Sequence, residues 1–261
     1  MSASTERPLI RARGIVNRFG AQRVHDGIGL DIAAGEIVGI AGGSGSGKSV
    51  LLKTLTGLHR PDAGEVLLEG RPVDAIERSR KASLFGVLFQ QGALFSSLTL
   101  AQNVMLPLRE HTDLPDALQQ RIAAMKLELA GLPAASGAKV PAELSGGMVK
   151  RAALARALAL DPRILFLDEP TANLDPPTAA GIDALIEQLN RGLGITVVVV
   201  THDLDTLVDV CHRVAVLHDG RVVVDTVAAL MHSEQPWLRE LLHRPRAHDA
   251  ATARRAAHGI G

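Results

Sequence analysis

The sequence GGSGSGKS at positions 42–49 lies between two contrasting patterns. Before it, Glu36–Ala41 (EIVGIA) is short and continuously apolar, which is typical of a buried strand. After it, Gly47–Leu58 carries apolar residues at helical spacing. A glycine loop that joins a strand to a helix presents backbone amides and the positive helix N-terminus to an anion. This stretch therefore predicts an α/β fold with a phosphate-binding loop.

The loop matches the pattern G-x-x-x-x-G-K-S/T, in which each residue type has a physical role. Glycines let the backbone wrap phosphates closely, Lys48 reaches the β and γ phosphates, and Ser49 can bind magnesium. A merely flexible glycine loop is the alternative, and the flanking strand and helix argue against it. The residues expected to hold the nucleotide are Gly42, Gly43, Ser44, Gly45, Ser46, Gly47, Lys48 and Ser49.

Apolar patterns elsewhere in the chain extend this fold. Leu9–Phe19 and Val24–Ile32 alternate like half-buried strands joined by a turn, which predicts an antiparallel sheet. Further along the chain, β-branched or apolar runs alternate with helical patterns, which predicts a covered parallel sheet. The predicted strands are Leu84–Gln90, Arg163–Asp168, Ile195–Thr201 and Val214–Leu217, and the predicted helices between the later ones are Pro177–Leu193 and Leu204–Cys211.

Residues 99–160 differ from the rest, because Ala, Leu, Arg and Gln recur there at helical spacing without a convincing strand. We expect a helical subdomain there, within one domain that spans residues 8–236. Residues 237–261 form a C-terminal extension that begins as a short amphipathic helix and becomes rich in Ala, Arg and His. Its end is expected to be mobile or bound to a partner.

Composition excludes several classes of protein. Lys plus Arg and Asp plus Glu each number 28, so the formal charge is zero and no global field attracts nucleic acid. Cys211 is the single cysteine and cannot form an intramolecular disulfide, so we interpret it as a small buried hydrophobe. The N-terminus lacks the apolar stretch of a secretory signal. Apolar runs such as Ile195–Val200 fall far short of the roughly 20 residues needed to cross a bilayer, so if the chain serves a membrane, a partner does the spanning.

Two acidic residues, Asp168 and Glu169, end a predicted apolar strand. The carboxyl ends of parallel strands share one edge of a sheet, so these acids are expected beside the phosphate loop. Asp168 can hold magnesium, and Glu169 can orient and polarise an attacking water. A solvated strand end is the alternative for Asp-Glu alone, but the loop upstream favours the functional interpretation.

Leu144–Met148 (LSGGM) precedes a long helix and is, by itself, explained as a helix cap. The other motifs of the chain change this interpretation. The phosphate loop, Gln90, LSGGM, ILFLDE, NLDP and His202 occur in this order, and the chain resembles the ATP-binding cassette (ABC) ATPases over nearly its whole length. The resemblance implies hydrolysis of ATP with Mg²⁺. It also implies a head-to-tail dimer of two copies, in which each ATP lies between one phosphate loop and Ser145, Gly146 and Gly147 of the other copy.

Further roles follow only from that resemblance. Phe19 resembles the aromatic residue that stacks on adenine, with a core phenylalanine as the alternative; the chain has no tyrosine. Gln90 resembles the glutamine that senses magnesium and the γ-phosphate, although Gln91 leaves a one-residue ambiguity. Asp175 resembles the aspartate that couples the two sites, and it is also suited to cap a helix. His202 resembles the switch histidine that contacts the γ-phosphate.

A narrower resemblance rests on three features: Gln91–Phe95 (QGALF), Pro107–Thr112 (PLREHT), and methionine in LSGGM. Together they resemble the ATPases of Mla-type phospholipid transporters. This implies integral membrane permeases, a periplasmic MCE lipid-binding protein and a small STAS-domain protein as partners. It places the chain at the cytoplasmic face of the inner membrane as a peripheral subunit. The direction of transport stays open, and so does a transporter for another substrate.

Two other functions compete with transport. An ABC-type ATPase that acts on DNA or ribosomes usually carries a coiled-coil insertion or a second cassette, and this chain shows neither and has no basic excess, so we expect no nucleic-acid partner. A subunit that closes on ATP but turns over poorly is the second alternative. Glu169 and His202 argue against it, because degenerate sites tend to lose such groups.

Overall fold

The computed structural model describes residues 7–238. Its strands are β1 (Ile10–Phe19), β2 (Gln22–Ile32), β3 (Ile37–Gly42), β4 (Ala63–Leu68), β5 (Arg71–Pro72), β6 (Phe85–Leu88), β7 (Ile164–Asp168), β8 (Thr196–Val200), β9 (Arg213–His218) and β10 (Arg221–Asp225). Its α-helices are α1 (Lys48–Leu55), α2 (Arg78–Leu84), α3 (Leu100–His111), α4 (Asp116–Leu129), α5 (Gly146–Ala157), α6 (Pro176–Leu193), α7 (Leu204–Asp209) and α8 (Val227–Met231). None of these helices combines the length and apolar character needed to cross a bilayer.

The central sheet has the strand order β10-β9-β3-β8-β7-β6, and all its neighbours are parallel except β10 with β9. Every residue of β3, β7 and β8 is buried, as expected for parallel strands covered on both faces. The predicted covered parallel sheet is therefore confirmed. The antiparallel edge strand β10 was not predicted.

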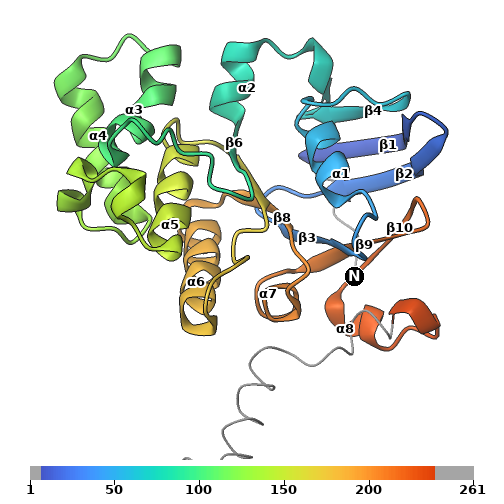
Figure 1. Ribbon diagram of the computed structural model, residues 1–261. Helices are drawn as coiled ribbons and strands as arrows, with labels where there is room; N and C mark the ends of the chain where they lie inside the picture. Colours follow the sequence, from blue (N-terminus) through green and yellow to red (C-terminus); the bar gives the residue numbers. More distant parts are fainter. Residues whose placement is uncertain (1–6, 239–261) are drawn as a thin grey trace, which may run out of the picture.

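A second sheet, in the order β2-β1-β4-β5, is antiparallel. Its first pair runs from Ile10 opposite Ile32 to Phe19 opposite Gln22, which confirms the antiparallel pair predicted from the N-terminal alternation. The inward face of this sheet shares one core with α1 and the central sheet. Figure 1 shows β1, β2 and β4 beside α1, at the opposite side of the molecule from α3 and α4.

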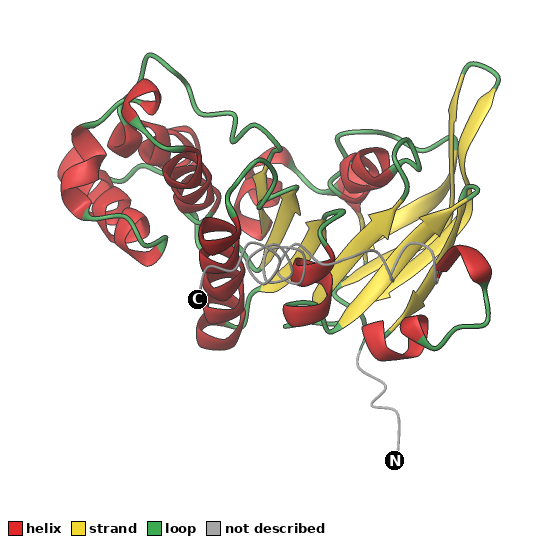
Figure 2. Cartoon of the chain, turned by 60° about the horizontal axis from the view of Figure 1, so that its bottom comes forward, coloured by secondary structure: helices red, strands yellow, loops and turns green. Residues whose placement is uncertain are grey.

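Residues 99–160 form the helices α3, α4 and α5 and two short 3₁₀ turns, so the helical character predicted for this segment is confirmed. Thr99 starts α3 with a capping box that includes Gln102, and Ser145 caps α5. The buried faces of these helices, with Leu100, Leu127 and Leu154, share one core with the neighbouring strands. Figure 2 shows a group of helices on one side of the molecule, whereas the strands lie on the other side together with further, shorter helices.

Several boundaries differ from the sequence-based expectations. Helix α1 is shorter than the predicted Gly47–Leu58, because Gly47 and Gly57 both adopt positive φ and bracket it. The predicted strand Leu84–Gln90 is reduced to β6, because Leu84 completes α2, a helix that was not predicted. Helix α8 was not predicted either. The prediction for the C-terminal extension concerns residues 239–261 for the most part, and these lie outside the described residues.

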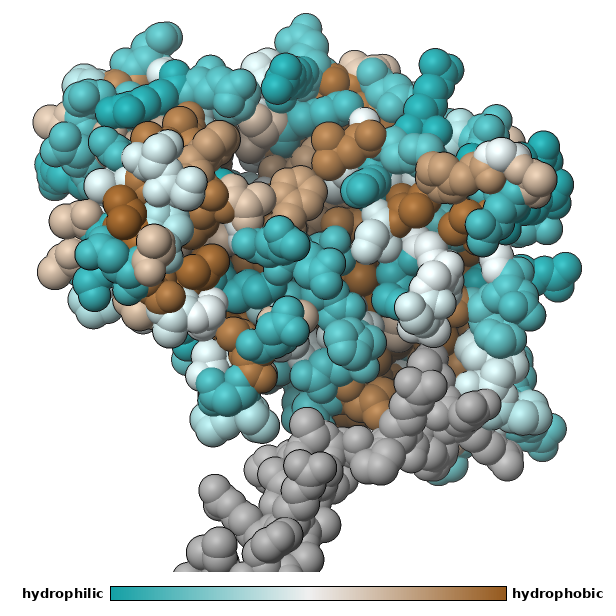
Figure 3. Space-filling model, in the orientation of Figure 1, coloured by the Kyte–Doolittle hydropathy of each residue, from teal (hydrophilic) through white to brown (hydrophobic). Residues whose placement is uncertain are grey.

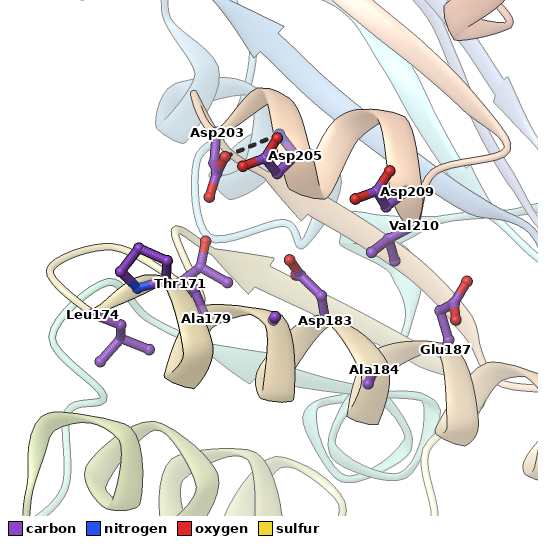
Figure 4. A pocket seen from close by; sticks show the side chains of 12 residues that line it. Thr171, Leu174, Ala179, Asp183, Ala184, Glu187, Asp203, Asp205, Asp209 and Val210 are labelled. Atoms are coloured by element: carbon purple, nitrogen blue, oxygen red, sulfur yellow. Dashed lines mark hydrogen bonds between the residues drawn. The ribbon is translucent and has the colours of Figure 1, made fainter. Parts of the chain in front are cut away.

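An acidic groove of about 430 Å³ lies between α6 and α7. Asp183 on α6 points toward α7, which contributes Asp203, Asp205 and Asp209 to the same groove (Figure 4). The Asp183 carboxylate accepts hydrogen bonds of 3.0 and 3.1 Å from the Thr206 hydroxyl. Burial and the neighbouring aspartates raise the pKa of Asp183 to about 7. A proton therefore stabilises this side chain in the folded state.

Packing of β6 against α5 requires a glycine at position 86. A Cβ atom there would collide with the Ala157 carbonyl, which is backbone and cannot swing aside. We expect Gly86→Ala to lower the free energy of unfolding by about 1–3 kcal/mol, the usual cost of overpacking. Urea denaturation measures this. Gly29→Ala is the matched control, because a Cβ at this strand glycine meets nothing within 4 Å; an equal loss in both variants would contradict the packing argument.

Stability should depend on pH through Asp183. Its folded pKa is raised from 3.8 to about 7, so the folded state binds the proton more tightly, and this contribution is lost as pH rises from about 4 through 7. Asp183→Asn keeps an acceptor for Thr206 and removes the charge. We expect it to raise Tm by about 2–6 °C at pH 8 and by less at pH 5.

Thermal scans at both pH values test the Asp183 prediction. Asp74→Asn, at an exposed position away from the groove, is the control and should shift Tm by less than about 2 °C at either pH. A gain for Asp183→Asn that is the same at pH 5 and pH 8 would show that the carboxyl does not titrate in this range.

Candidate functional site

The loop from Gly42 to Ser49 leaves the end of β3 and enters α1. Gly42, Gly45 and Gly47 all have positive φ (151°, 76° and 94°), a conformation in which side chains are strained and in which successive amides turn toward one point. The Lys48 ammonium donates to the Gly42 and Gly43 carbonyls, each at 2.9 Å. The Ser46 hydroxyl is buried without a partner among the described residues. This cradle suits an anion, as the motif predicts.

A buried polar cluster beneath the loop was missed by the sequence reasoning. The Asn17 amide nitrogen donates to His25 Nδ1 at 2.9 Å and to the Thr54 hydroxyl at 3.0 Å, and all three residues are fully buried. A Cβ on Gly47 would lie 2.6 Å from His25 Nε2, so the imidazole fills the space directly under the loop. Burial lowers the pKa of His25, which keeps the ring neutral. The cluster therefore supports Gly47 from the antiparallel sheet.

Asp168 and Ser49 face each other across the sheet edge. The Ser49 hydroxyl lies 3.5 Å from Asp168 Oδ1, although the two residues are far apart in sequence. Burial, followed by the charge of Glu169, raises the pKa of Asp168, and burial lowers the pKa of Lys48. A hydroxyl and a carboxylate are the hard oxygen ligands that Mg²⁺ takes together with substrate phosphates. Among residues 7–238, no three His, Cys, Asp or Glu side chains form a group that could hold a metal ion.

Glu169 and His202 form a pair at the ends of β7 and β8. Glu169 Oε1 lies 2.8 Å from His202 Nδ1, while Glu169 Oε2 is buried and has no partner among the described residues. The Glu169 backbone has φ of 50°, which is uncommon for a residue with a side chain. The His202 side chain is 71% exposed. The free carboxylate oxygen can accept a proton or a hydrogen bond from water.

Phe19 and Gln90 differ in part from expectation. The alternative of a core phenylalanine is wrong, because Phe19 is 49% exposed; its ring stacks on His59 with centroids 5.4 Å apart. Gln90 does not end its strand as expected, since β6 stops at Leu88 and both Gln90 and Gln91 lie exposed in the following turn. The strand end therefore does not choose between the two glutamines.

Ser145 and Asp175 are both helix caps. The Ser145 hydroxyl accepts from the Met148 amide at 3.4 Å at the start of α5, and Asp175 accepts from the Thr178 amide at 3.1 Å and from its hydroxyl at 2.7 Å at the start of α6. These bonds hold the pKa of Asp175 below its usual value. Helix α5 packs on β6 and on other helices, whereas α1 packs on β3, β7 and β8. Among the described residues, no hydrogen bond joins Ser145–Gly147 to the phosphate loop, and the Ser145 hydroxyl bonds within its own helix.

Comparison with known proteins agrees with this geometry. The family model described as "ABC transporter" matches residues 25–172. A "Probable ribonucleotide transport ATP-binding protein mkl" of Mycobacterium leprae is 42% identical over 90% of this chain and 68% of its own length. An "Intermembrane phospholipid transport system ATP-binding protein MlaF" of Escherichia coli K12 is 40% identical over 90% of this chain and 88% of its own length.

Solved structures agree as well. The ATP-binding cassette MJ0796, in a "dimeric structure of a post-hydrolysis state" with ADP and Pi bound, superposes with a TM-score of 0.76 at 32% identity over 83% of this chain and 98% of that one. The cbiO1 protein of Clostridium perfringens has a TM-score of 0.77 at 27% identity, and the match covers 96% of each chain. The chain therefore belongs to the ABC transporter family, as an ATP-binding cassette that hydrolyses ATP.

Proposed function

We propose that this chain is the ATP-hydrolysing subunit of a phospholipid transporter and that it works as a head-to-tail dimer. One observation carries the catalytic part: Glu169, held by His202, keeps one carboxylate oxygen without a partner among residues 7–238, at the sheet edge where Ser49 and Asp168 also meet. Such a group positions water for attack on a terminal phosphate, and phosphoryl transfer depends mainly on positioning and charge stabilisation.

The proposed roles divide the site between binding and chemistry. Gly42–Ser49 holds the triphosphate of ATP, with Lys48 at the β and γ phosphates. Phe19 offers its exposed face to adenine, backed by His59. Glu169 orients the water and accepts its hydrogen bond, while His202 fixes the carboxylate and contacts the γ-phosphate. Ser49, Asp168 and Gln90 would hold Mg²⁺, which neutralises phosphate charge when bound.

Dimerisation would complete each site. Ser145, Gly146 and Asp175 are exposed and lie at helix N-termini, where backbone amides and the positive helix end favour a phosphate or a facing chain. Because no hydrogen bond among the described residues joins this segment to the phosphate loop of the same chain, a second copy would supply it. The dimeric state described for the MJ0796 cassette supports this arrangement.

A groove of about 300 Å³ between β6 and α3 is the proposed permease contact, and its lining includes Phe85, Phe89, Phe95, Leu106 and Pro107. Phe95 is 58% exposed, yet its backbone is fixed by the buried Asn103, which accepts from its amide at 2.8 Å and donates to its carbonyl at 3.1 Å. In Figure 3, hydrophobic residues gather where the helices on the left meet the rest of the molecule. An aromatic side chain held exposed by a fixed backbone suits an interface anchor.

The phospholipid substrate rests on the named MlaF relative and on the QGALF and PLREHT segments, both of which contribute to the lining of this groove. The mkl relative carries the name of a ribonucleotide transporter, so a different substrate is the alternative. The proposed machine comprises two copies of this chain, two permeases, a periplasmic MCE protein and a small STAS-domain protein, with this chain at the cytoplasmic face of the inner membrane. The cassette would span residues 8–236, with the helical subdomain at 99–160.

Glu169→Gln should keep ATP binding and lower the ATPase rate by at least about 100-fold, because the amide retains a hydrogen bond to His202 but cannot take a proton from water. Size-exclusion chromatography with ATP should show the variant trapped as a dimer. Glu128→Gln, at an exposed position of α4, is the isosteric control and should hydrolyse ATP normally. Normal turnover by Glu169→Gln would refute the proposed role of the carboxylate.

Substrate class is tested by reconstituting the chain with its permease and MCE partner in vesicles that contain labelled phospholipid. We expect ATP-dependent phospholipid transfer, and loss of transfer in Lys48→Ala, which should weaken nucleotide binding by removing the cation at the phosphates. Lipid should also co-purify with the complex. Uptake of ribonucleotides without phospholipid transfer would assign the transporter to the other substrate class.

A further inference from the structure

Lys150 on α5 is a buried cation whose partners are two backbone carbonyls of the site. It is only 6% exposed, and its ammonium donates to the Gln90 carbonyl at 2.5 Å and to the Glu169 carbonyl at 2.8 Å. Those partners belong to the turn after β6 and to the end of β7, respectively. One side chain therefore joins three segments: the helix that begins at Ser145, the loop that faces the proposed permease contact, and the end of the strand with the proposed catalytic acid.

Because the Lys150 ammonium is buried, it destabilises the fold unless its hydrogen bonds to both carbonyls are made. Loss of water lowers the pKa of Lys150, and the charges of Glu169 and Asp168 oppose that effect. A buried ammonium needs several acceptors, and a buried carbonyl that loses its donor is itself destabilised. The two carbonyls and the ammonium therefore hold one another in place, and a shift of one partner strains the others.

The Glu169 backbone is the part most sensitive to such a shift. Its φ of 50° is an unfavourable conformation for a side-chain-bearing residue and persists only where neighbouring contacts enforce it. Three hydrogen bonds do so here: the Glu169 amide donates to the Val200 carbonyl at 2.8 Å, and the Glu169 carbonyl accepts from Lys150 at 2.8 Å and from the Ala172 amide at 3.3 Å. The direction of the Glu169 carboxylate depends on this backbone conformation.

The loop on the other side of Lys150 is bound to α5 by a second cation. Arg156 donates to the Ala93 carbonyl at 2.6 Å and to the Gly92 carbonyl at 3.0 Å. Lys150 and Arg156 together attach residues 90–93 to one helix through carbonyl oxygens. Motion of this loop, such as docking of a partner beside Phe95 would impose, is then transmitted to α5 and to Glu169.

We propose that Lys150 is a positioning residue that couples the loop at residues 90–93 to the orientation of Glu169, and this rests on the proposed role of Glu169 in hydrolysis. Lys150 touches neither phosphates nor water in this scheme. Its loss should leave nucleotide binding intact and slow the chemical step.

Lys150→Met keeps the stem length and removes the donors. In the purified full-length chain we expect kcat to fall about 10–100-fold, the usual effect of a misplaced catalytic group, with KM for ATP unchanged within about twofold. Lys150→Arg restores donors and should recover kcat to within about fivefold of wild type. Lys126→Met is the matched control: Lys126 is equally buried, on α4, but pairs with Asp161 away from the site. It should lower Tm without changing kcat.

The parallel measurement of Glu169→Gln separates the possible failures. If Glu169→Gln hydrolyses ATP normally, the proposed role of Glu169 falls. If Glu169→Gln is inactive while Lys150→Met keeps the wild-type kcat, only the coupling through Lys150 is refuted. Loss of kcat in Lys150→Met that Lys126→Met reproduces at equal loss of Tm would show that Lys150 acts only in stability.

Discussion

The parallel hydrogen-bond ladder that joins β3, β8 and β7 is the constraint on which the site depends. Val200 pairs with Ile40 on one side and with Asp168 on the other, so β7 and β8 end at the same level, beside Ile40 of β3. Gly42, Glu169 and His202 lie within two residues of this level. A slip of one pair would move Asp168 away from Ser49 and turn alternate side chains to the opposite face.

Around this edge, burial and charge work against each other. Burial raises the pKa of Asp168 and lowers that of Lys48 and Lys150, and the opposite charges of the acids and lysines limit these shifts. Removing any one of them would leave a partly buried charge uncompensated. These charges agree with the proposed binding of a phosphate together with a cation, since a negative ligand alone would lie beside two carboxylates.

Three supports surround the site and come from different parts of the fold. The antiparallel sheet supports Gly47 through His25, the neighbouring strand supports the Glu169 backbone through Val200, and the helical segment reaches Glu169 and the loop at residues 90–93 through Lys150. The phosphate loop therefore rests on the part of the chain that lies far from α5. Glu169, in contrast, is bound through Lys150 to the helical segment, which carries the proposed permease contact. Binding and hydrolysis can thus be affected separately.

The sequence by itself determined the strand–loop–helix at residues 36–58, the acids at the end of β7 and the helical character of residues 99–160, because each depends on residue types that are neighbours in the chain. It could not determine where β6 begins, since Leu84 suits a buried helix end as well as a strand. Only the tertiary structure decided that Phe19 lies exposed, that His25 lies under Gly47, and that Lys150 reaches Gln90 and Glu169. The two contacts of Lys150 join residues that are 60 and 19 positions apart in the chain. Their acceptors are backbone carbonyls, which every residue carries and which no sequence pattern marks.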